Sequence, residues 1–335
     1  MAAPTPKRPT IRDVAALAGV SHQTVSRVIN GDDTVRPQTR ARVLQTIEQI
    51  DYRVRRVTPT RTHCIGMVTT DVSDHSFAEA VAGAEKEARR RGYYLMVASV
   101  EESSEEDDSG YLRLLLERRI EGLILARAHT PSEQLLAAIA NGVPVVTIGP
   151  RVGEHSAVDV DNVGAAREAV AHLLGRGHRS IAMITGPGDW PAVRSRSAGY
   201  HAAHEEWGIT AAAELVEDAL DWSPTSGQAA TARLLARGTP FTALFAHSDL
   251  VALGAIRELR AHGLAVPEDV SVVGFDDIDV AAFFDPPLTT VRQPMDRVGG
   301  LAASLLIDGD RTRSRLHLLP ATVIARESVA DVARS

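Results

Sequence analysis

Four polar side chains near the N-terminus have the types and the spacing of a surface that contacts nucleic-acid bases. Gln23 and Arg27 stand four residues apart, and His22 and Ser26 repeat that spacing beside them. Residues four apart share one face of an α-helix. In the major groove of DNA, Gln binds adenine bidentately and Arg binds guanine in the same way. A helix over these residues is therefore predicted to contact bases, although ordinary surface helices also carry Gln and Arg.

The sequence around these side chains predicts two short helices joined by a glycine turn. Thr10 is placed to cap the first helix, and Asp13 completes a capping box in which Asp replaces the usual Glu. Gly19 offers the positive φ that ends a helix, and Ser21 is placed to cap the second one. This arrangement is a helix-turn-helix unit. The expected inner faces consist of Val14, Leu17 and Ala18 on the first helix and of Val25, Val28 and Ile29 on the second.

A third helix is expected over residues 37–50, and it would complete a small all-α head that spans residues 1–52. The stretch 53–63 is basic, contains Pro59 and lacks an apolar stripe, so it is predicted to be a short basic linker. The expected inner face of the third helix consists of Val43, Leu44, Ile47 and Ile50.

The charge of the chain is distributed unevenly. The whole sequence carries a formal net charge of −7, which by itself argues against a nucleic-acid partner. Residues 1–63 nevertheless hold eleven Lys or Arg and only five Asp or Glu, so the remaining residues are strongly acidic. A basic segment attached to an acidic body indicates a nucleic-acid-binding head and a second part with another task.

Length and composition limit the class of protein. A chain of 335 residues with 44% hydrophobic residues predicts two or three folded units of a globular protein. The single cysteine, Cys64, excludes an intrachain disulfide and favours a reducing, cytoplasmic location. No run resembles a signal peptide or a membrane span, so no membrane partner is expected. The acidic stretch 101–108 is expected to be a solvated loop and helix start, and no metal site is expected.

From residue 64 onward, short β-branched or apolar runs alternate with helical stretches. This alternation predicts parallel sheets with right-handed crossovers, and its two successive series predict two doubly wound α/β lobes. Ligands of such folds bind at the carboxyl ends of the strands, here in the cleft between the lobes. The body is expected to span 64–335, with lobe one at about 64–160 and 292–319 and lobe two at about 161–291 and 320–335.

The expected strands and helices of the body follow from these runs. Strands are expected at 65–68, 93–97, 123–125, 143–148, 181–184, 243–245 and 270–273. Helices are expected at 77–91, 111–118, 133–140, 163–174, 194–207, 226–235 and 250–261.

Several segments, taken in order, resemble the lac/gal repressor family of bacterial transcription factors. Besides residues 10–30, the resemblance is carried by VRPQTRARV from Val35, the DN pair at Asp161, LLGRGHRSIAMITGP from Leu173, RSAG from Arg196, SDLVALGAI from Ser248, PEDVSVVGFDD from Pro267 and PPLTTVRQP from Pro286. These segments cover nearly the whole chain. The resemblance implies a helix-turn-helix head followed by two parallel-sheet lobes of the periplasmic-binding-protein-like type, without a cofactor.

The resemblance also implies roles for single positions in the head. His22 and Gln23 lie where the family contacts operator bases, and Arg27 lies where it contacts guanine. In the linker, Arg55 and Arg56 are expected to lie along the phosphates or in the minor groove. The positions expected to hold phosphates are Thr10, Ser21, Thr24, Ser26 and Asn30.

Seven residues of the body are candidates for binding an effector. Arg196 matches an arginine that binds ligand hydroxyl or carboxylate groups, and Asp276 matches an acidic ligand contact. Trp222, within DWSPTSG, matches a tryptophan that stacks on a sugar ring, and Trp190 is expected to form a second aromatic wall. For both tryptophans, core packing is the alternative. The remaining candidates are Phe77 in the loop after the first strand, Ser248 at a polar pocket position and Gln293 at the lobe crossover.

Three departures from the family pattern bear on function. The stretch 52–65 is about four residues shorter and lacks the hinge leucine that wedges into DNA, so weaker operator bending is expected. Asp-His-Ser-Phe stands at 74–77 where the family has Asn-Pro-Phe-Phe, which removes one aromatic wall. An acidic ligand contact is replaced near 149–151. The last two departures leave the identity of the effector open.

Together these features predict a repressor of double-stranded operator DNA that a small molecule, most simply a sugar inducer, releases. A nucleobase or a phosphoprotein corepressor is the alternative for the same architecture. An α/β enzyme is disfavoured, because the sequence has no Walker loop, G-x-S-x-G elbow or H-E-x-x-H motif. A secreted solute receptor with the same two lobes is also disfavoured, because it would carry a signal peptide and would lack the basic head. One recognition helix touches few base pairs, so a homodimer on an inverted repeat is expected.

Overall fold

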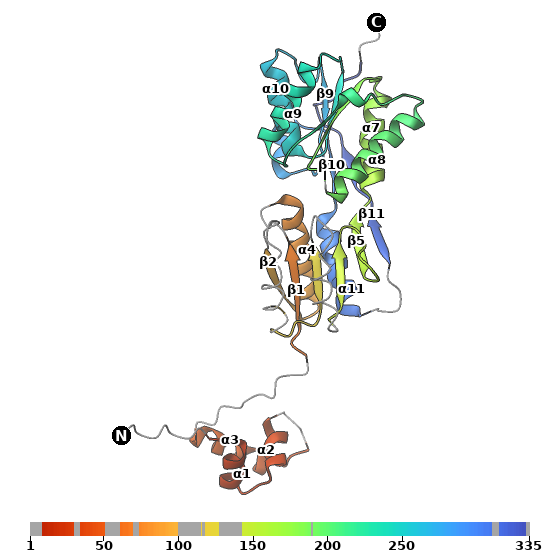
Figure 1. The fold of residues 1–335 in the computed structure, drawn as a ribbon. Helices are drawn as coiled ribbons and strands as arrows, with labels where there is room; N and C mark the ends of the chain where they lie inside the picture. The colour runs from red at the N-terminus through yellow and green to blue at the C-terminus, as the bar shows by residue number, and fades with distance from the viewer. Residues whose placement is uncertain are drawn as a thin grey trace, which may run out of the picture. The chain divides into compact units, whose positions relative to one another are not determined.

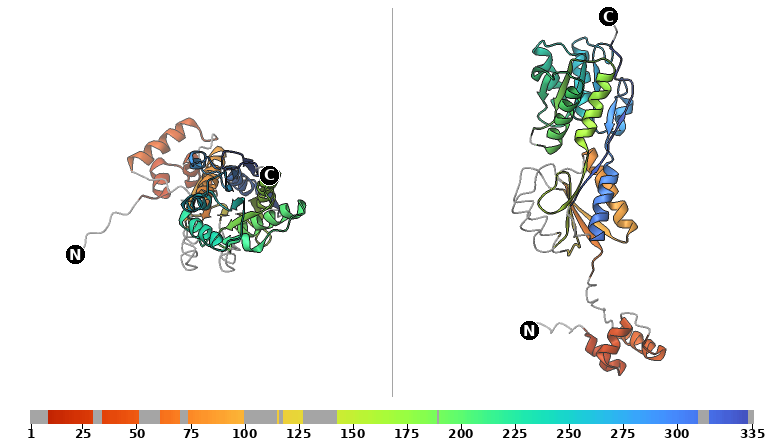
Figure 2. Two further views of the ribbon diagram at one scale, coloured as in Figure 1. Left: turned by 90° about the horizontal axis from the view of Figure 1, so that it is seen from above. Right: turned by 90° about the vertical axis from the view of Figure 1, so that its right-hand side faces the viewer.

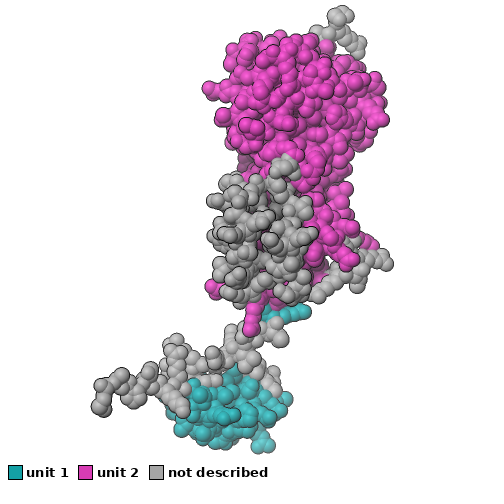
Figure 3. Space-filling model, viewed as in Figure 1, with its two compact units in different colours: residues 1–62 teal, residues 63–335 magenta. Residues whose placement is uncertain are grey.

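The computed structural model describes residues 9–29, 34–50, 61–69, 74–99, 115, 118–126, 143–188, 190–309 and 315–332. The chain forms two compact units, residues 1–62 and residues 63–335 (Figure 3). Among the described residues, no helix is long and apolar enough to cross a bilayer. The predictions for Asn30, Arg55, Arg56, the acidic stretch 101–108, the helix at 133–140 and all of the helix at 111–118 except Leu115 and Arg118 lie outside the described residues.

The first unit contains the three predicted helices: α1 (Ile11–Ala18), α2 (His22–Ile29) and α3 (Pro37–Gln49) (Figure 1). The Thr10 hydroxyl accepts a hydrogen bond from the Asp13 amide at 3.4 Å, and the Asp13 carboxylate accepts one from the Thr10 amide at 2.7 Å. Gly19 ends α1 with a φ of 63°. Ser21 Oγ accepts a hydrogen bond from the Thr24 amide at 3.1 Å. The predicted caps and the predicted glycine turn are confirmed.

The core of the head consists mainly of small and β-branched side chains. Val14, Val25 and Val43, one from each helix, are fully buried against one another. Two expected core residues are not buried: Leu17 is 66% exposed and Leu44 is 51% exposed. These two predictions were wrong because three helices of at most 13 residues enclose only a narrow seam. One side of each apolar stripe therefore stays in solvent.

Lobe one of the second unit is built on a six-stranded sheet. Its order is β11-β5-β4-β3-β1-β2, and every pair of neighbours is parallel. Side chains alternate between its faces, so that Ile65 and Met67 pack under α4 (His75–Arg90) and α11 (Met295–Asp308), whereas Val68 belongs to the opposite face. The strands are β1 (Cys64–Thr69), β2 (Tyr94–Ser99), β3 (Leu123–Ala126), β4 (Val145–Ile148), β5 (Ser156–Val160) and β11 (Leu316–Leu319).

Lobe two has a four-stranded parallel sheet in the order β7-β6-β8-β9. Ile181 and Met183 of β6 face α7 and α8, whereas Ala182 and Ile184 face α9 and α10. Helices therefore cover both faces, and the predicted doubly wound lobes are confirmed. The elements are α7 (Asn162–Gly175), β6 (Ile181–Thr185), α8 (Pro191–Glu206), η1 (Ala213–Leu215), β7 (Val216–Asp218), α9 (Pro224–Ala236), β8 (Ala243–Ala246), α10 (Asp249–Ala261), β9 (Ser271–Val273) and η2 (Asp279–Phe283).

Three short segments connect the lobes. The chain leaves lobe one after β5, returns to it between β10 (Thr290–Arg292) and α11, and leaves it again between β11 and β12 (Thr322–Ile324). β10 and β12 pair in antiparallel fashion beside lobe two. The second and third crossings therefore lie next to one another, and they place Gln293 at the junction of the lobes.

α4 and α11 pack backbone to backbone. A Cβ atom on Gly83 would lie 1.8 Å from the Asp296 carbonyl oxygen, and one on Gly299 would lie 1.9 Å from the Ala80 carbonyl oxygen. The two helices run side by side in the right-hand view of Figure 2. The sequence pattern does not predict α11, because Gly299 and Gly300 in its middle disfavour an isolated helix. Its close packing on α4 stabilises the helix instead.

Candidate functional site

The outward face of α2 carries the predicted base-reading side chains. His22, Gln23 and Arg27 are exposed, whereas Val25 and Val28 are buried in the head. The apolar stripe therefore fixes the helix on its inner side and leaves the polar face toward solvent. This is the arrangement that recognition in the major groove requires.

The side chains predicted to hold phosphates lie at the helix ends and beside that face. The exposed Thr10 and Ser21 are the caps of α1 and α2, and Ser21 Oγ lies 2.9 Å from Thr24 Oγ1. Thr24 and Ser26 are half-buried on α2. Contact of these residues with DNA stays a prediction.

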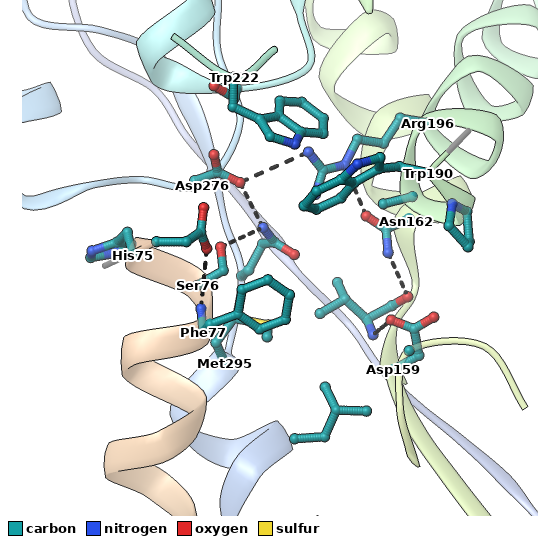
Figure 4. A pocket seen from close by; sticks show the side chains of 18 of the residues that line it. His75, Ser76, Phe77, Asp159, Asn162, Trp190, Arg196, Trp222, Asp276 and Met295 are labelled. Atoms are coloured by element: carbon teal, nitrogen blue, oxygen red, sulfur yellow. Dashed lines mark hydrogen bonds and ion pairs between the residues drawn. The ribbon is translucent and has the colours of Figure 1, made fainter. Parts of the chain in front are cut away.

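A cavity of about 300 Å³ lies between the lobes of the second unit (Figure 4). Lobe one contributes the ends of β4 and β5 and the first turns of α4 and α11, and lobe two contributes the first turns of α8 and α10. The structure brings all seven candidate effector residues to its lining: Phe77, Trp190, Arg196, Trp222, Ser248, Asp276 and Gln293.

Arg196 is the buried cation of this cavity. Only 6% of its surface is exposed, and its Nε donates a hydrogen bond to Asn162 Oδ1 at 2.9 Å. Nη1 donates to the carbonyl oxygen of His247 and lies 3.9 Å from Asp276 Oδ1. The guanidinium also stacks over the ring of Phe275, with its Cζ 3.7 Å from the ring centroid. Burial lowers the pKa of Arg196, and the surrounding carboxylates oppose that shift.

Asp276 points into the cavity from a left-handed backbone conformation with a φ of 116°. Its Oδ1 accepts a hydrogen bond from Gln293 Nε2 at 2.7 Å. Burial raises the pKa of Asp276 well above its usual value, while the charge of Arg196 acts in the opposite direction. The next residue, Asp277, instead pairs with Arg292 at 2.6 Å and with Arg326. The adjacent carboxylates thus serve different partners.

Two tryptophans form an aromatic corner. The rings of Trp190 and Trp222 meet edge to face, with centroids 5.3 Å apart and an interplanar angle of 75°. Trp222 lies directly on Gly186, where a Cβ atom would come within 2.1 Å of the indole. Its Nε1 is buried and has no hydrogen-bond partner among the described residues. Trp190 immediately precedes α8 and also packs against the core of lobe one.

The other candidates are held by helix starts. Phe77 lies in the first turn of α4 rather than in the expected loop, because Asp74 caps that helix by accepting a hydrogen bond from the Phe77 amide at 3.2 Å. Ser248 caps α10, with its Oγ 3.3 Å from the Val251 amide. Gln293 Nε2 lies 3.5 Å from Ser76 Oγ, so it connects the lobes as well as contacting Asp276.

Five polar residues of the lining were not among the predicted effector residues: Asp74, His75, Ser76, Asp159 and Asn162. Asn162 orients Arg196, and its own Nδ2 donates a hydrogen bond to the Val160 carbonyl at 3.2 Å. Asp159 accepts a hydrogen bond from the Val160 amide at 2.8 Å, and burial raises its pKa to about 6. The available signal was their position after β-branched runs, at the carboxyl ends of strands. Within the described part of the chain, no three His, Cys, Asp or Glu residues gather as metal ligands would.

Comparison with known proteins assigns the family. A model described as "Bacterial regulatory proteins, lacI family" matches residues 10–54, and one for a periplasmic binding protein-like domain matches residues 170–329. The HTH-type transcriptional regulator CelR of Thermobifida fusca is 38% identical over 340 residues, which cover 96% of this chain and 98% of the relative. The chain belongs to the lacI family of bacterial regulatory proteins.

Solved structures of this family agree with the fold described above. A transcriptional regulator CelR–cellobiose complex has a TM-score of 0.74 at 37% identity and covers 96% of this chain and 100% of its own. The lac repressor dimer bound to operator and the anti-inducer ONPF has a TM-score of 0.79 at 31% identity, with coverage of 97% and 100%. These relatives are regulators of transcription, and this lacI-family chain is a DNA-binding transcriptional regulator.

Proposed function

We propose that this regulator is a repressor that a sugar releases from its operator. The observation that carries the proposal is the aromatic corner of Trp190 and Trp222 beside the pair Arg196 and Asp276 in one cavity. An indole face packs on the apolar C–H face of a sugar ring. The guanidinium donates hydrogen bonds and the carboxylate accepts them, so together they satisfy ring hydroxyl groups.

The size of the cavity supports a small sugar. Its volume of about 300 Å³ lies at the lower end of the range for ligand pockets, which suits one or two sugar rings. The relative in the cellobiose complex binds a disaccharide, which supports the same ligand class here. The buried Trp222 Nε1–H offers one more donor for a ring or hydroxyl oxygen.

The head is proposed to read the operator as one of a pair. His22, Gln23 and Arg27 would contact bases, and two heads in a homodimer would read a palindrome. The lac repressor relative is a dimer on its operator, which supports this assembly. We infer that the protein acts on chromosomal DNA in the cytoplasm and is not an enzyme, as its relatives are transcriptional regulators.

Release of DNA by sugars tests the proposal. An operator is selected from a random palindromic library with the full chain, and binding is followed by fluorescence anisotropy. Cellobiose or glucose is expected to raise the Kd for this operator at least tenfold. Trp222→Ala should bind the operator normally but lose this response. Trp207→Ala is the matched control, since Trp207 lies outside the cavity lining.

Two results would contradict the proposal. If Trp222→Ala is released by sugar as efficiently as the unmodified chain, the cavity is not the effector site. If adenosine or hypoxanthine releases the operator and no sugar does, the nucleobase alternative replaces the sugar.

A further inference from the structure

We propose that the cavity selects sugars without negative charge, and that Asp159 is the residue that enforces this selection. Neutral and amino sugars would bind, whereas sugar phosphates and uronic acids would be rejected. The inference rests on the proposed sugar response and specifies the chemical class of the effector.

The charge of the lining favours such a ligand. Among the described lining residues, Asp74, Asp159 and Asp276 are carboxylates, and Arg196 is the one guanidinium or ammonium group. The carboxylates still outnumber the guanidinium if Asp276 binds a proton. Burial weakens the screening of these charges by water, so an anionic ligand in the cavity would be repelled by the carboxylates.

Arg196 is not arranged to attract an anion. Its Nε is used by Asn162 and its Nη1 by the His247 carbonyl, while its charge is opposed by Asp276 at 3.9 Å. One face of the guanidinium is covered by Phe275. A phosphate or carboxylate would therefore meet a cation that already has an ionic partner. The hydroxyl oxygen of a neutral sugar, in contrast, needs only one of the remaining N–H groups of Arg196.

Asp159 offers an acceptor on the opposite wall. It lies near the end of β5 in lobe one, whereas Arg196 and Asp276 belong to lobe two (Figure 4). Oδ1 accepts the Val160 amide, and within the described residues the carboxylate has no ion pair. Because the pKa of Asp159 is about 6, the carboxylate is largely ionised at neutral pH, although burial raises that pKa. It therefore accepts from hydroxyl or ammonium donors and repels anions.

The position of Asp159 in lobe one also affects how a sugar would join the two lobes. A sugar stacked on Trp222 that also donates to Asp159 contacts both lobes at once. An anionic sugar could avoid Asp159 only by giving up that bridge. Selection by charge and contact between the lobes are thus properties of the same carboxylate.

Calorimetry on the full chain tests the inference with five probes: glucose, cellobiose, glucosamine, glucuronate and glucose 6-phosphate. At pH 7.5, the better neutral probe is expected to bind at least 100-fold more tightly than either anion. Asp159→Asn keeps the size of the side chain but removes its charge. This variant should bind the neutral probe about tenfold more weakly, as expected for a lost charge-assisted hydrogen bond. The ratio between the Kd values of the anionic and neutral probes should fall at least tenfold. Glu168→Gln, on the exposed side of α7, should change neither value.

A pH series separates a direct contact from a structural role. The affinity for the neutral probe should fall as the pH drops below about 6, because protonation removes the negative acceptor. In Asp159→Asn this part of the profile should be absent. Asp74, His75, Asp276 and Arg196 also line the cavity, but they are present in both proteins. The difference between the two profiles therefore reports Asp159.

The outcomes are distinguishable. Binding of glucuronate or glucose 6-phosphate as tight as that of the neutral probes would overturn the charge selection. Equal affinity of Asp159→Asn and the unmodified chain for the neutral probe would overturn the role of Asp159, while the sugar response would stand. If no probe binds or releases the operator, the proposed function fails and this inference fails with it.

Discussion

Gly186 controls the aromatic corner without being part of the cavity lining. Its Cα faces the six-membered ring of Trp222, so the Cβ of Gly186→Ala would lie 2.1 to 2.5 Å from three indole carbons. Because the Trp222 ring must move, its edge-to-face contact with Trp190 at 5.3 Å is lost. Such a contact contributes about 0.5–1.5 kcal/mol beyond buried area. The face on which the sugar stacks moves with the ring. We therefore expect the binding free energy of the sugar to weaken by about 1–2 kcal/mol, which raises its Kd roughly 5- to 30-fold.

A double-mutant cycle measures this effect. Titration calorimetry gives the sugar affinity, and urea unfolding gives the free energy of unfolding, which overpacking should lower by about 1–3 kcal/mol. In a Trp222→Ala background the alanine at 186 has no ring to displace, so both losses should disappear. Gly188→Ala is the control, because its Cβ would have no atom within 4 Å.

A loss of sugar affinity in Gly186→Ala that is the same with and without Trp222 would contradict this prediction. Equal effects of Gly186→Ala and Gly188→Ala would contradict it as well. Either result would mean that the loop acts through its backbone and not through the indole ring.

Three other predictions concern DNA recognition, packing and assembly. Arg27→Ala should cost about 1–3 kcal/mol per half-site and relax the preference at one symmetric operator position in a binding-site selection. Arg55→Ala and Arg56→Ala should weaken specific and random DNA alike and reduce the salt dependence, and identical behaviour of all three variants would refute the assignment of α2. Gly299→Ala should lower the free energy of unfolding of the second unit by about 1–3 kcal/mol in urea, since its Cβ would lie 1.9 Å from the Ala80 carbonyl oxygen. Gly300→Ala, with its nearest atom at 3.5 Å, should be neutral or slightly stabilising, and equal effects at 299 and 300 would exclude the backbone contact as the cause. Light scattering should give a homodimer, which a monomer with full operator affinity would contradict.

Local signals in the sequence were sufficient to predict the caps and the glycine turn of the head. Thr10, Gly19 and Ser21 act within four residues of their own positions, so their roles could be predicted without the tertiary structure. The exposure of Leu17 and Leu44 depends instead on how much room three short helices leave between them. Periodicity indicates the apolar side of a helix but not the width of the seam that it fills.

The cavity residues that could be predicted are mainly those that match ligand positions of the family. Arg196 and Trp222 match such positions, and both line the cavity. Asp159 could not be predicted in this way, since an acidic residue within a short strand looks like an interruption of that strand. α11 was missed for a related reason: its glycines have a purpose only beside the backbone of α4.

The close pairing of α4 and α11 gives lobe one a mechanical property. α4 begins at the cavity, where Asp74 caps it, and its 16 residues make it about 24 Å long. Beyond its far end, Arg91 is tied to Asp308 of α11, and the ring of Tyr93 contacts His63, the first residue of the second unit. Because the two backbones touch at Gly83 and Gly299, we expect the two helices to move together as one stiff lever. A tilt of about 5° at the ligand would move the opposite end by about 2 Å, and that end lies where the chain from the head enters.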